Sequence, residues 1–264
     1  MSSLQVEGYN IHYEQAGSGP PVILIHGHSS SWRCWRETIL ALSPHFTVYA
    51  IDLLGFGDSD KPGYDYTIEN FARLVKGFIE AAGITRASLV GHSMGGTTAI
   101  CMAIRYPDLV GSVVLVGSPV SRLWPLPLRM MTLPLIFDIP YSVLPRRFIK
   151  FGLKRAAVAS ADGSIEQFLE EWAEDSIKAA REMSRKSMRD LGRIDYTGSL
   201  GEIRAPALIV FGDRERLVPL IQAETLNRGI PNSKLVIIEG TGHGVMFEKP
   251  EEYNRVVLEF LREG

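Results

Sequence analysis

Short runs of consecutive apolar residues are the feature of this sequence that most restricts its fold. Residues 22–25, for example, read Val-Ile-Leu-Ile, which is typical of a strand covered on both faces. Stretches with helical spacing separate such runs; from Ile68 to Ile79 the apolar residues fall on one helix face, and Gly83 ends the stretch. Alternating strands and helices predict an α/β fold with a mostly parallel sheet and helices on both faces. The runs span residues 22–25, 46–51, 88–90, 113–116, 207–211 and 235–238.

The composition excludes several functional classes. The 264 residues are 45% hydrophobic and 22% charged, a balance that allows a sizeable core. The formal charge of −2 gives no basic field, so we expect no nucleic-acid partner. No window reaches the ~18 apolar residues of a membrane span, and the first ten residues do not resemble a secretory signal. A cytoplasmic location is therefore the default expectation.

The two cysteines give no sign of a metal or a disulfide framework. Cys34 and Cys101 are too few and too far apart in the chain for either. We expect both to be buried small apolar residues, and we expect no metal site.

The alternation of strands and helices fails between about residues 119 and 198. This stretch has no convincing strand, many early prolines and a later helical apolar stripe. We therefore predict a helical cap (lid) over residues 119–198, inserted into a core domain of residues 1–118 and 199–264.

Charge is segregated within the predicted cap. Basic residues between positions 146 and 155 precede acidic residues between 166 and 175. A solvated or mutually paired surface is the favoured interpretation, and a membrane-facing or anion-binding patch is the alternative.

Residues 91–95 read Gly-His-Ser-Met-Gly and match the pattern G-x-S-x-G. They follow the predicted strand over 88–90 and open a helical stretch over 97–106, the strand–turn–helix setting that this motif requires. The tight turn pushes the serine out at a helix N-terminus, where free N–H groups favour developing negative charge. We predict that Ser93 is a nucleophile.

A serine hydroxyl needs a base within hydrogen-bond reach. Among the six histidines, His243 stands out because it lies in a glycine-rich segment directly after the predicted strand over 235–238, where catalytic groups of such sheets gather. His12 and His45 have no such setting. His92 lies inside the motif, and we expect it to have a packing or supporting role. His243 is the predicted base.

The base in turn needs a carboxylate that orients it. Asp213 follows the predicted strand over 207–211 and is the favoured residue. Glu215 is a competitor but lies two residues further from the strand end. The strand over 113–116 is followed by Gly-Ser-Pro, so it supplies no alternative carboxylate.

An oxyanion hole completes the predicted machinery. The backbone N–H of Met94 is one expected donor, and the loop after residues 22–25 should supply the second. His28 N–H is the best candidate in that loop. The His28 side chain either lines the substrate pocket together with Trp32 and Trp35 or has no role beyond its backbone.

The substrate pocket is expected to be apolar. Residues 123–137 form an apolar stretch that contains methionine, which tolerates ligands of varied shape. With Trp32 from the core, we select Trp124, Met131 and Phe137 as candidate pocket residues. The alternative is that this stretch only attaches the cap to the core.

These motifs resemble the α/β-hydrolase superfamily, and the resemblance covers the whole core. It rests on the segments 26–27, 52–59, 91–95, 211–213 and 242–243 and on the order Ser93, Asp213, His243. Esterase-like members with a small helical cap are most similar. The resemblance implies a cap over the active site, no cofactor and an acyl-enzyme intermediate. It also implies a structural role for the carboxylates of residues 52–59.

The resemblance separates the chain from some siblings. Dehalogenases and epoxide hydrolases of this fold have aspartate where this chain has Ser93, and hydroxynitrile lyases have lysine where it has Gly244. Carbon–carbon bond hydrolases usually have an oxyanion loop richer in glycine than residues 26–30. This last argument rests on one loop only.

Taken together, the sequence predicts a serine hydrolase, a carboxylesterase that cleaves small to medium apolar carboxylic esters. Its partner would be a small-molecule ester substrate, and the sequence specifies no oligomeric state. A ligand-binding receptor of the same fold with weak turnover remains an alternative. Carbon–carbon bond hydrolysis, lactone opening, perhydrolysis and acyl transfer also remain open, because they use the same residues.

Overall fold

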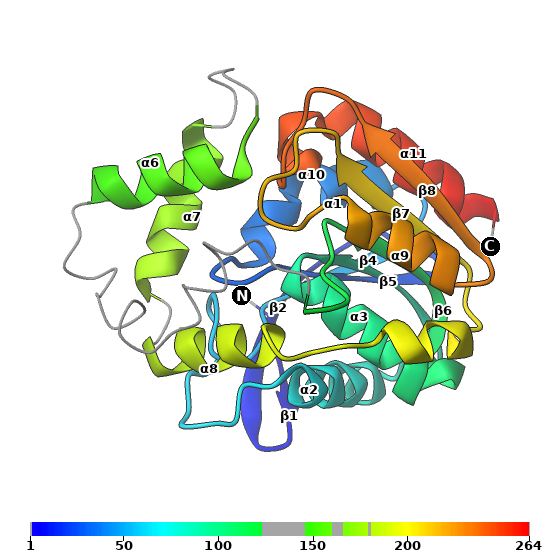
Figure 1. Cartoon of the computed structure of the whole chain (residues 1–264). Coiled ribbons are helices and arrows are strands. Elements are labelled where there is room, and N and C mark those ends of the chain that lie inside the picture. Colours follow the sequence, from blue (N-terminus) through cyan, green and yellow to red (C-terminus); the bar gives the residue numbers. More distant parts are fainter. Residues whose placement is uncertain (1, 123–145, 160–165, 179–180, 264) are drawn as a thin grey trace.

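The computed structural model of the protein describes residues 2–122, 146–159, 166–178 and 181–263. At its centre lies an eight-stranded sheet with the order β1-β2-β4-β3-β5-β6-β7-β8 (Figure 1). The pairs β1–β2 and β2–β4 are antiparallel, and all pairs from β4 to β8 are parallel. The predicted α/β fold with a mostly parallel sheet is confirmed. The strands are β1 (Ser2–Val6), β2 (Tyr9–Ala16), β3 (Pro21–Ile25), β4 (Thr47–Ile51), β5 (Ala87–His92), β6 (Val110–Val116), β7 (Ala207–Gly212) and β8 (Ser233–Ile238).

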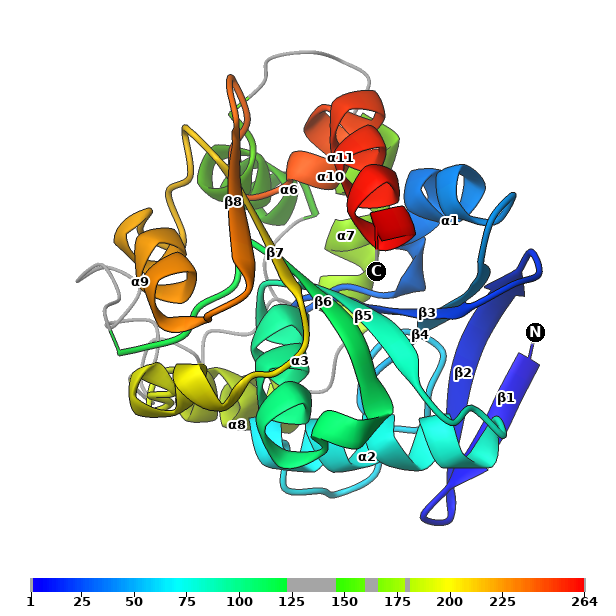
Figure 2. The ribbon, with the colours of Figure 1, turned by 90° about the vertical axis from the view of Figure 1, so that its right-hand side faces the viewer.

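Helices cover both faces of the sheet (Figure 2). The helices α2, α3 and α9 pack on one face, and α1, α10 and α11 pack on the other. The helical segments of the core are η1 (Trp32–Trp35), α1 (Arg36–Leu42), α2 (Ile68–Ala81), α3 (Met94–Arg105), η2 (Pro107–Leu109), η4 (Thr197–Glu202), α9 (Ile221–Gly229), α10 (Val245–Glu248) and α11 (Pro250–Glu263).

Strand β3 shows why the apolar runs form central strands. Ile23 and Ile25 belong to the core beneath α2 and α3, whereas Val22 and Leu24 belong to the core beneath α1 and α11. All four side chains are buried. Because successive side chains of a strand point to opposite faces, a strand with a core on each side needs an apolar residue at every position.

Helix α2 illustrates the agreement between local signals and packing. The Oγ1 of Thr67 caps its N-terminus by accepting a hydrogen bond from the N–H of Asn70 (3.2 Å), which satisfies one of the unpaired N–H groups of the first turn. The predicted apolar face, which includes Phe71, Val75 and Phe78, is buried against the sheet.

Three helices follow β6 and precede β7 in the part of the predicted cap that the structure describes. They are α6 (Arg146–Ala157), α7 (Glu166–Lys178) and α8 (Arg181–Leu191). Figure 1 shows α6 and α7 beside the main body, and α7 contacts η1, which follows the carboxyl end of β3. The bounds of the cap remain a prediction.

The charges of the cap pair with one another. Lys150 Nζ of α6 lies 2.5 Å from Glu166 Oε1 and 2.5 Å from Glu170 Oε1 of α7, and Lys154 Nζ lies 3.7 Å from Glu166 Oε2. These contacts support the interpretation of a mutually paired surface. Within the described ranges, no helix is long and apolar enough to cross a membrane.

Candidate active site

Ser93 occupies a strained turn between β5 and α3. Its φ of 52° and ψ of −118° lie in a region that costs a non-glycine residue about 1–3 kcal/mol. A Cβ at Gly91 would overlap the carbonyl of Gly95, and a Cβ at Gly95 would overlap the carbonyl of Ile25. The glycines of the motif therefore allow α3 to pack closely against β3 and β5. The Ser93 N–H donates to the carbonyl of Val116 (2.8 Å), which ties the turn to the end of β6.

His243 lies after β8, as predicted, but its carboxylate partner is Glu215. The His243 Nδ1 is 2.6 Å from Glu215 Oε2, and the two side chains are 4% and 0% exposed. Asp213, the favoured residue in the sequence analysis, is exposed. The pairing of His243 with Asp213 is therefore a wrong expectation, and the competitor Glu215 occupies that place.

The chain path after β7 explains why Glu215, and not Asp213, faces His243. Asp213 N–H still donates to the carbonyl of Ile238 in β8 (3.2 Å), and Arg214 N–H donates to the carbonyl of Thr241 (2.9 Å). Backbone pairing with the neighbouring loop thus continues past the strand end and leaves the Asp213 side chain outside. The longer Glu215 side chain, two residues later, points back toward His243.

The Glu215 carboxylate is held by the backbone as well as by the histidine. Its Oε1 accepts hydrogen bonds from the N–H groups of Leu217 (2.7 Å) and Val218 (3.2 Å). The Glu215 carboxylate therefore accepts three hydrogen bonds, one from His243 and two from the backbone. Because a carboxylate oxygen accepts, the bond to His243 is donated by Nδ1–H, which leaves Nε2 as the acceptor of the ring.

Gly117 makes room for the His243–Glu215 pair. A Cβ at this position would lie 3.0 Å from His243 Nδ1 and 3.4 Å from Glu215 Oε2, and its φ is +52°. The sequence analysis noted only that the segment after β6 lacks a carboxylate. The residue before Gly117 is Val116, whose carbonyl accepts the hydrogen bond from the Ser93 N–H. The serine turn and His243 therefore both lie beside the segment 116–117.

His92 joins the serine turn to the histidine loop. Its Nε2–H donates to the carbonyl of His243 (2.9 Å), and the two rings lie 4.6 Å apart. Burial, and secondly the nearby His243, lower the pKa of His92 well below its usual value. A neutral His92 adds no charge that would oppose a protonated His243. The predicted supporting role fits this position.

The loop after β3 lies directly against Ser93. A Cβ at Gly27 would lie 3.2 Å from the Cβ of Ser93. The His26 Nδ1–H donates to the carbonyl of Gly27 (2.7 Å), and its Nε2 accepts from the N–H of Leu53 (3.0 Å). This pattern requires a neutral ring, and burial lowers the pKa of His26 accordingly. His28 follows immediately, half-buried.

Met94 is the first residue of α3 and is fully buried. Its N–H is thus one of the unpaired groups at a helix N-terminus. Met94 directly follows Ser93, and His28 directly follows Gly27, which lies against Ser93; the role of both as oxyanion donors remains a prediction.

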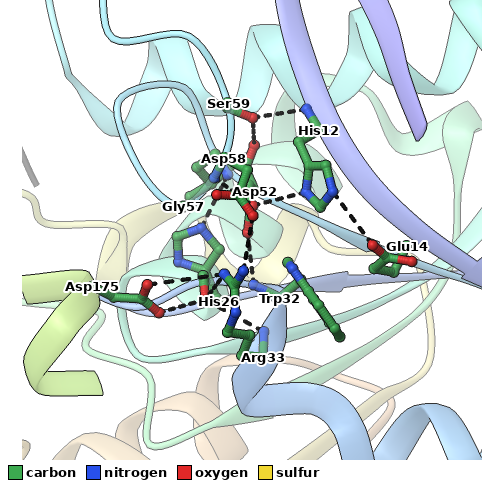
Figure 3. Close-up of polar contacts among 12 residues, drawn as sticks. His12, Glu14, His26, Trp32, Arg33, Asp52, Gly57, Asp58, Ser59 and Asp175 are labelled. Atoms are coloured by element: carbon green, nitrogen blue, oxygen red, sulfur yellow. Dashed lines mark hydrogen bonds and ion pairs between the residues drawn. The ribbon is translucent and has the colours of Figure 1, made fainter. Parts of the chain in front are cut away.

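Asp52 is the centre of a buried polar cluster beneath the loop after β3 (Figure 3). Its Oδ1 accepts from the N–H of Trp32 (2.7 Å), and its Oδ2 accepts from the N–H of Asp58 (2.9 Å) and from His12 Nδ1 (2.9 Å). A Cβ at Gly57 would overlap this carboxylate. These contacts support the structural role that the resemblance implies for residues 52–59.

The same cluster is where three possible metal ligands converge among the described residues. Ligand atoms of His12, Asp52 and Asp58 lie within 4.8 Å of one another. The Asp52 oxygens already accept three hydrogen bonds, and Asp58 Oδ2 lies 3.0 Å from Arg33 Nη2. Since protein donors occupy these oxygens, the arrangement is that of an ion-paired network.

The candidate pocket residues divide into two groups. Trp32 lies under the guanidinium groups of Arg33 (5.2 Å) and Arg36 (5.4 Å), and its ring lies 6.5 Å from that of His12 in β2. Trp124, Met131 and Phe137 lie outside the described residues. Their role, like that of Trp32, remains a prediction.

An apolar cluster that the sequence analysis did not identify joins α7 to the loop after β7 and to α10. Leu169 and Trp172 of α7 join Val158, and they pack against Leu217 and Phe247. Leu217 follows Glu215 by two residues, and Phe247 follows His243 by four. The cap therefore packs an apolar surface directly on the segments that carry the histidine and its carboxylate.

Known proteins with similar sequences share one fold family. A family model described as the alpha/beta hydrolase fold matches residues 20–250. A 2-hydroxy-6-oxo-6-phenylhexa-2,4-dienoate hydrolase of Comamonas testosteroni is 31% identical over 279 aligned residues, covering 100% of this chain and 95% of the relative.

Two solved structures are similar over nearly their full length. A meta-cleavage product hydrolase from Pseudomonas fluorescens superposes with a TM-score of 0.85 at 27% identity, covering 100% of this chain and 98% of that one. An esterase from Exiguobacterium antarcticum superposes with a TM-score of 0.88 at 22% identity, covering 99% of each chain; at that identity the likeness concerns the fold alone.

Proposed function

Because the chain belongs to the α/β-hydrolase fold family, we propose that it is a serine hydrolase with Ser93 as nucleophile, His243 as base and Glu215 as the orienting carboxylate. The observation that carries the proposal is the buried hydrogen bond between His243 and Glu215 beside the strained Ser93 turn. A serine hydroxyl is activated by a neighbouring base that a third group orients, and a histidine whose Nδ1–H is held by a carboxylate keeps Nε2 as the acceptor that such a base needs.

The reaction would begin with attack of Ser93 Oγ on a carbonyl carbon while His243 Nε2 takes the hydroxyl proton. The N–H groups of Met94 and His28 would stabilise the negative oxygen of the tetrahedral intermediate. The protonated His243 then gives its proton to the leaving group, which departs and leaves an acyl-Ser93. A water molecule, deprotonated by His243, attacks the acyl group. As the second tetrahedral intermediate collapses, His243 returns the proton to Ser93 Oγ and the acid is released.

We propose a small to medium apolar carboxylic ester as substrate. The cluster of Leu169, Trp172, Leu217 and Phe247 supports this choice because it places apolar side chains beside the His243 and Glu215 loops. An ester needs no group beyond those already described, since its leaving alcohol requires only the proton that His243 carries.

Hydrolysis of a carbon–carbon bond is the second candidate, and the relatives favour it. The Comamonas testosteroni protein at 31% identity is named for a 2-hydroxy-6-oxo-dienoate substrate, and a similar hydrolase from Paraburkholderia phymatum is 30% identical. The sequence argument against this class rested on the loop over residues 26–30, and these likenesses reduce its weight. Such a reaction would also attack a carbonyl, but a carbon leaving group must accept the proton.

Parallel assays with two substrates test the proposal. We would measure kcat/KM for p-nitrophenyl butyrate and for 2-hydroxy-6-oxo-6-phenylhexa-2,4-dienoate with the wild type, with Ser93→Ala and with Ser112→Ala. Ser112 is a buried serine of β6 and serves as the matched control. Ester turnover that exceeds dienoate turnover and is lost only in Ser93→Ala supports the esterase. The reverse ratio supports carbon–carbon hydrolysis.

Labelling with a fluorophosphonate identifies the nucleophile independently of the substrate. Mass spectrometry should find the label on Ser93. Label on another serine, or undiminished turnover in Ser93→Ala, would overturn the site assignment. Tight ligand binding without turnover of either substrate would instead favour the receptor alternative.

A further inference from the structure

Helix α7 of the cap is fastened to the loop that runs from His28 to Ser31. Ser31 Oγ donates to Asp175 Oδ2 (2.5 Å), and Ser176 Oγ donates to the backbone carbonyl of Ser29 (3.3 Å). Figure 3 shows Asp175 reaching this region from α7. Two adjacent residues of one helix thus hold both ends of a three-residue segment that begins directly after His28.

The loop needs external support because of its backbone conformation. Ser29 has a φ of 57°, in the left-handed region that a non-glycine residue adopts only when its surroundings hold it there. Its carbonyl is the group to which Ser176 donates. The preceding peptide links His28 to Ser29, so the orientation of the loop at His28 depends on this strained residue.

Asp175 is built into the contact. Its side chain is 6% exposed, and Arg33 Nη1 lies 4.0 Å from its Oδ1, so the buried carboxylate has both a hydrogen-bond donor and a positive partner. Arg33 also pairs with Asp58 (3.0 Å). The Asp175 contact therefore continues into the polar cluster that supports the loop from below (Figure 3).

We propose that Asp175 and Ser176 are positioning residues that hold the loop of residues 28–31 in the conformation in which His28 N–H faces the oxyanion. This inference rests on the proposed function, because it needs His28 N–H as a donor. Helix α7 thereby helps to position the oxyanion hole through its two contacts with this loop.

The variants Asp175→Ala and Ser176→Ala test the inference, with Glu171→Gln as the matched control. Glu171 lies on the same helix and pairs with Arg36 of α1, so its variant weakens a contact between α7 and the core by removing the charge from an ion pair that includes none of residues 28–31. Ser176→Ala is the milder change and remains informative if Asp175→Ala fails to fold. Melting temperatures identify any variant with a general loss of stability.

Kinetics and inhibition separate positioning from simple covering of the site. Both loop variants should lower kcat at least about tenfold, a part of the ~10²–10³ that a lost oxyanion donor costs, while KM changes by less than about threefold. They should raise the inhibition constant of a trifluoromethyl ketone, which forms a tetrahedral adduct, by the same factor as kcat falls. The inhibition constant of the matching methyl ketone should stay unchanged. Hydrogen exchange of the amides of residues 27–31 should accelerate in both variants but not in Glu171→Gln.

Three results would overturn the inference. They are an unchanged kcat in both loop variants, a change in KM alone, and an equal loss in Glu171→Gln. If these variants behave like the wild type while Ser93→Ala is inactive, positioning by α7 fails and the proposed function stands. If Ser93→Ala retains full turnover, the proposed function fails, and faster exchange in residues 27–31 would then show a purely structural contact.

Discussion

Replacement of Glu215 by glutamine is the sharpest test of the site. The change keeps the shape of the side chain and an oxygen that can still accept from Leu217 and Val218 N–H. The amide nitrogen would then face His243 Nδ1. Since an amide NH₂ only donates, His243 would have to accept at Nδ1 and carry its proton on Nε2, where it cannot remove the proton of Ser93.

The magnitude follows from the geometry of the pair. His243 Nδ1 and Glu215 Oε2 are 2.6 Å apart and both side chains are buried, which puts the charge centres of an imidazolium and a carboxylate roughly 4 Å apart. At an effective dielectric constant of about 20 such a pair attracts by about 4 kcal/mol. With ~1.4 kcal/mol for each tenfold change in rate, loss of the charge alone costs roughly 10³. The wrong tautomer adds to this, so we expect kcat to fall about 10³–10⁴-fold.

Asp213→Asn is the matched control, because it makes the same chemical change in the exposed carboxylate two residues away. Its kcat should stay within about threefold of the wild type, as surface substitutions usually have small effects. Both variants are compared by steady-state turnover of p-nitrophenyl butyrate. A large loss in Asp213→Asn together with near-normal turnover in Glu215→Gln would refute the assignment drawn from the structure.

Three further outcomes are expected. Gly117→Ala should lower kcat at least about tenfold and cost about 1–3 kcal/mol in urea unfolding, because its Cβ would lie 3.0 Å from His243 Nδ1 at a φ of +52°; full activity would contradict this. The hydrogen bond to Asp52 raises the pKa of His12 above 6.5, so its stabilising contribution is present below that pH and is lost as the pH rises through the folded-state pKa. His12→Asn should therefore destabilise more at about pH 5.5 than at about pH 8.5. Burial lowers the pKa of His92, so the wild type should lose up to about 1.4 kcal/mol per pH unit below 6.5, and His92→Asn should reduce that slope in urea titrations.

The sequence was sufficient for the central strands and for placing Ser93 and His243 at the same edge of the sheet. Central strands such as β3 are buried on both faces, so their apolar runs are continuous and unambiguous. Ser93 and His243 could be placed because each directly follows or adjoins a strand end, where local pattern decides position. The amphipathic edge strand β1 and helix α9 carry weaker patterns, and the sequence analysis did not define them.

The carboxylate could not be placed in the same way because its position depends on contacts between distant segments. Proximity to the end of β7 favoured Asp213, yet the loop after β7 continues to pair with the loop after β8 through Arg214 N–H and the Thr241 carbonyl. That pairing depends on two segments far apart in sequence. The local signal for Glu215 was the length of its side chain. From position 215 a glutamate can reach back to His243, whereas a shorter aspartate at the same position could not.

The contacts between α7 and the loop of residues 28–31 were even harder to predict from the sequence. Nothing in the pattern around Asp175 and Ser176 distinguishes them from their acidic neighbours, which form ion pairs at the surface of the cap. What distinguishes Asp175 is the hydrogen bond from Ser31 Oγ, which exists only once α7 is packed against this loop.

Glycines, which have no side chain, shape the candidate site as much as Ser93 and His243 do. Gly27 lies where a Cβ would touch Ser93, Gly95 lies where a Cβ would overlap the end of β3, and Gly117 lies where a Cβ would crowd His243. The segments that follow β3, β5 and β6 can therefore pack closely around Ser93 and His243. Because each close approach is set by packed strands, the geometry should tolerate changes in peripheral side chains far better than the addition of one methyl group at any of these glycines.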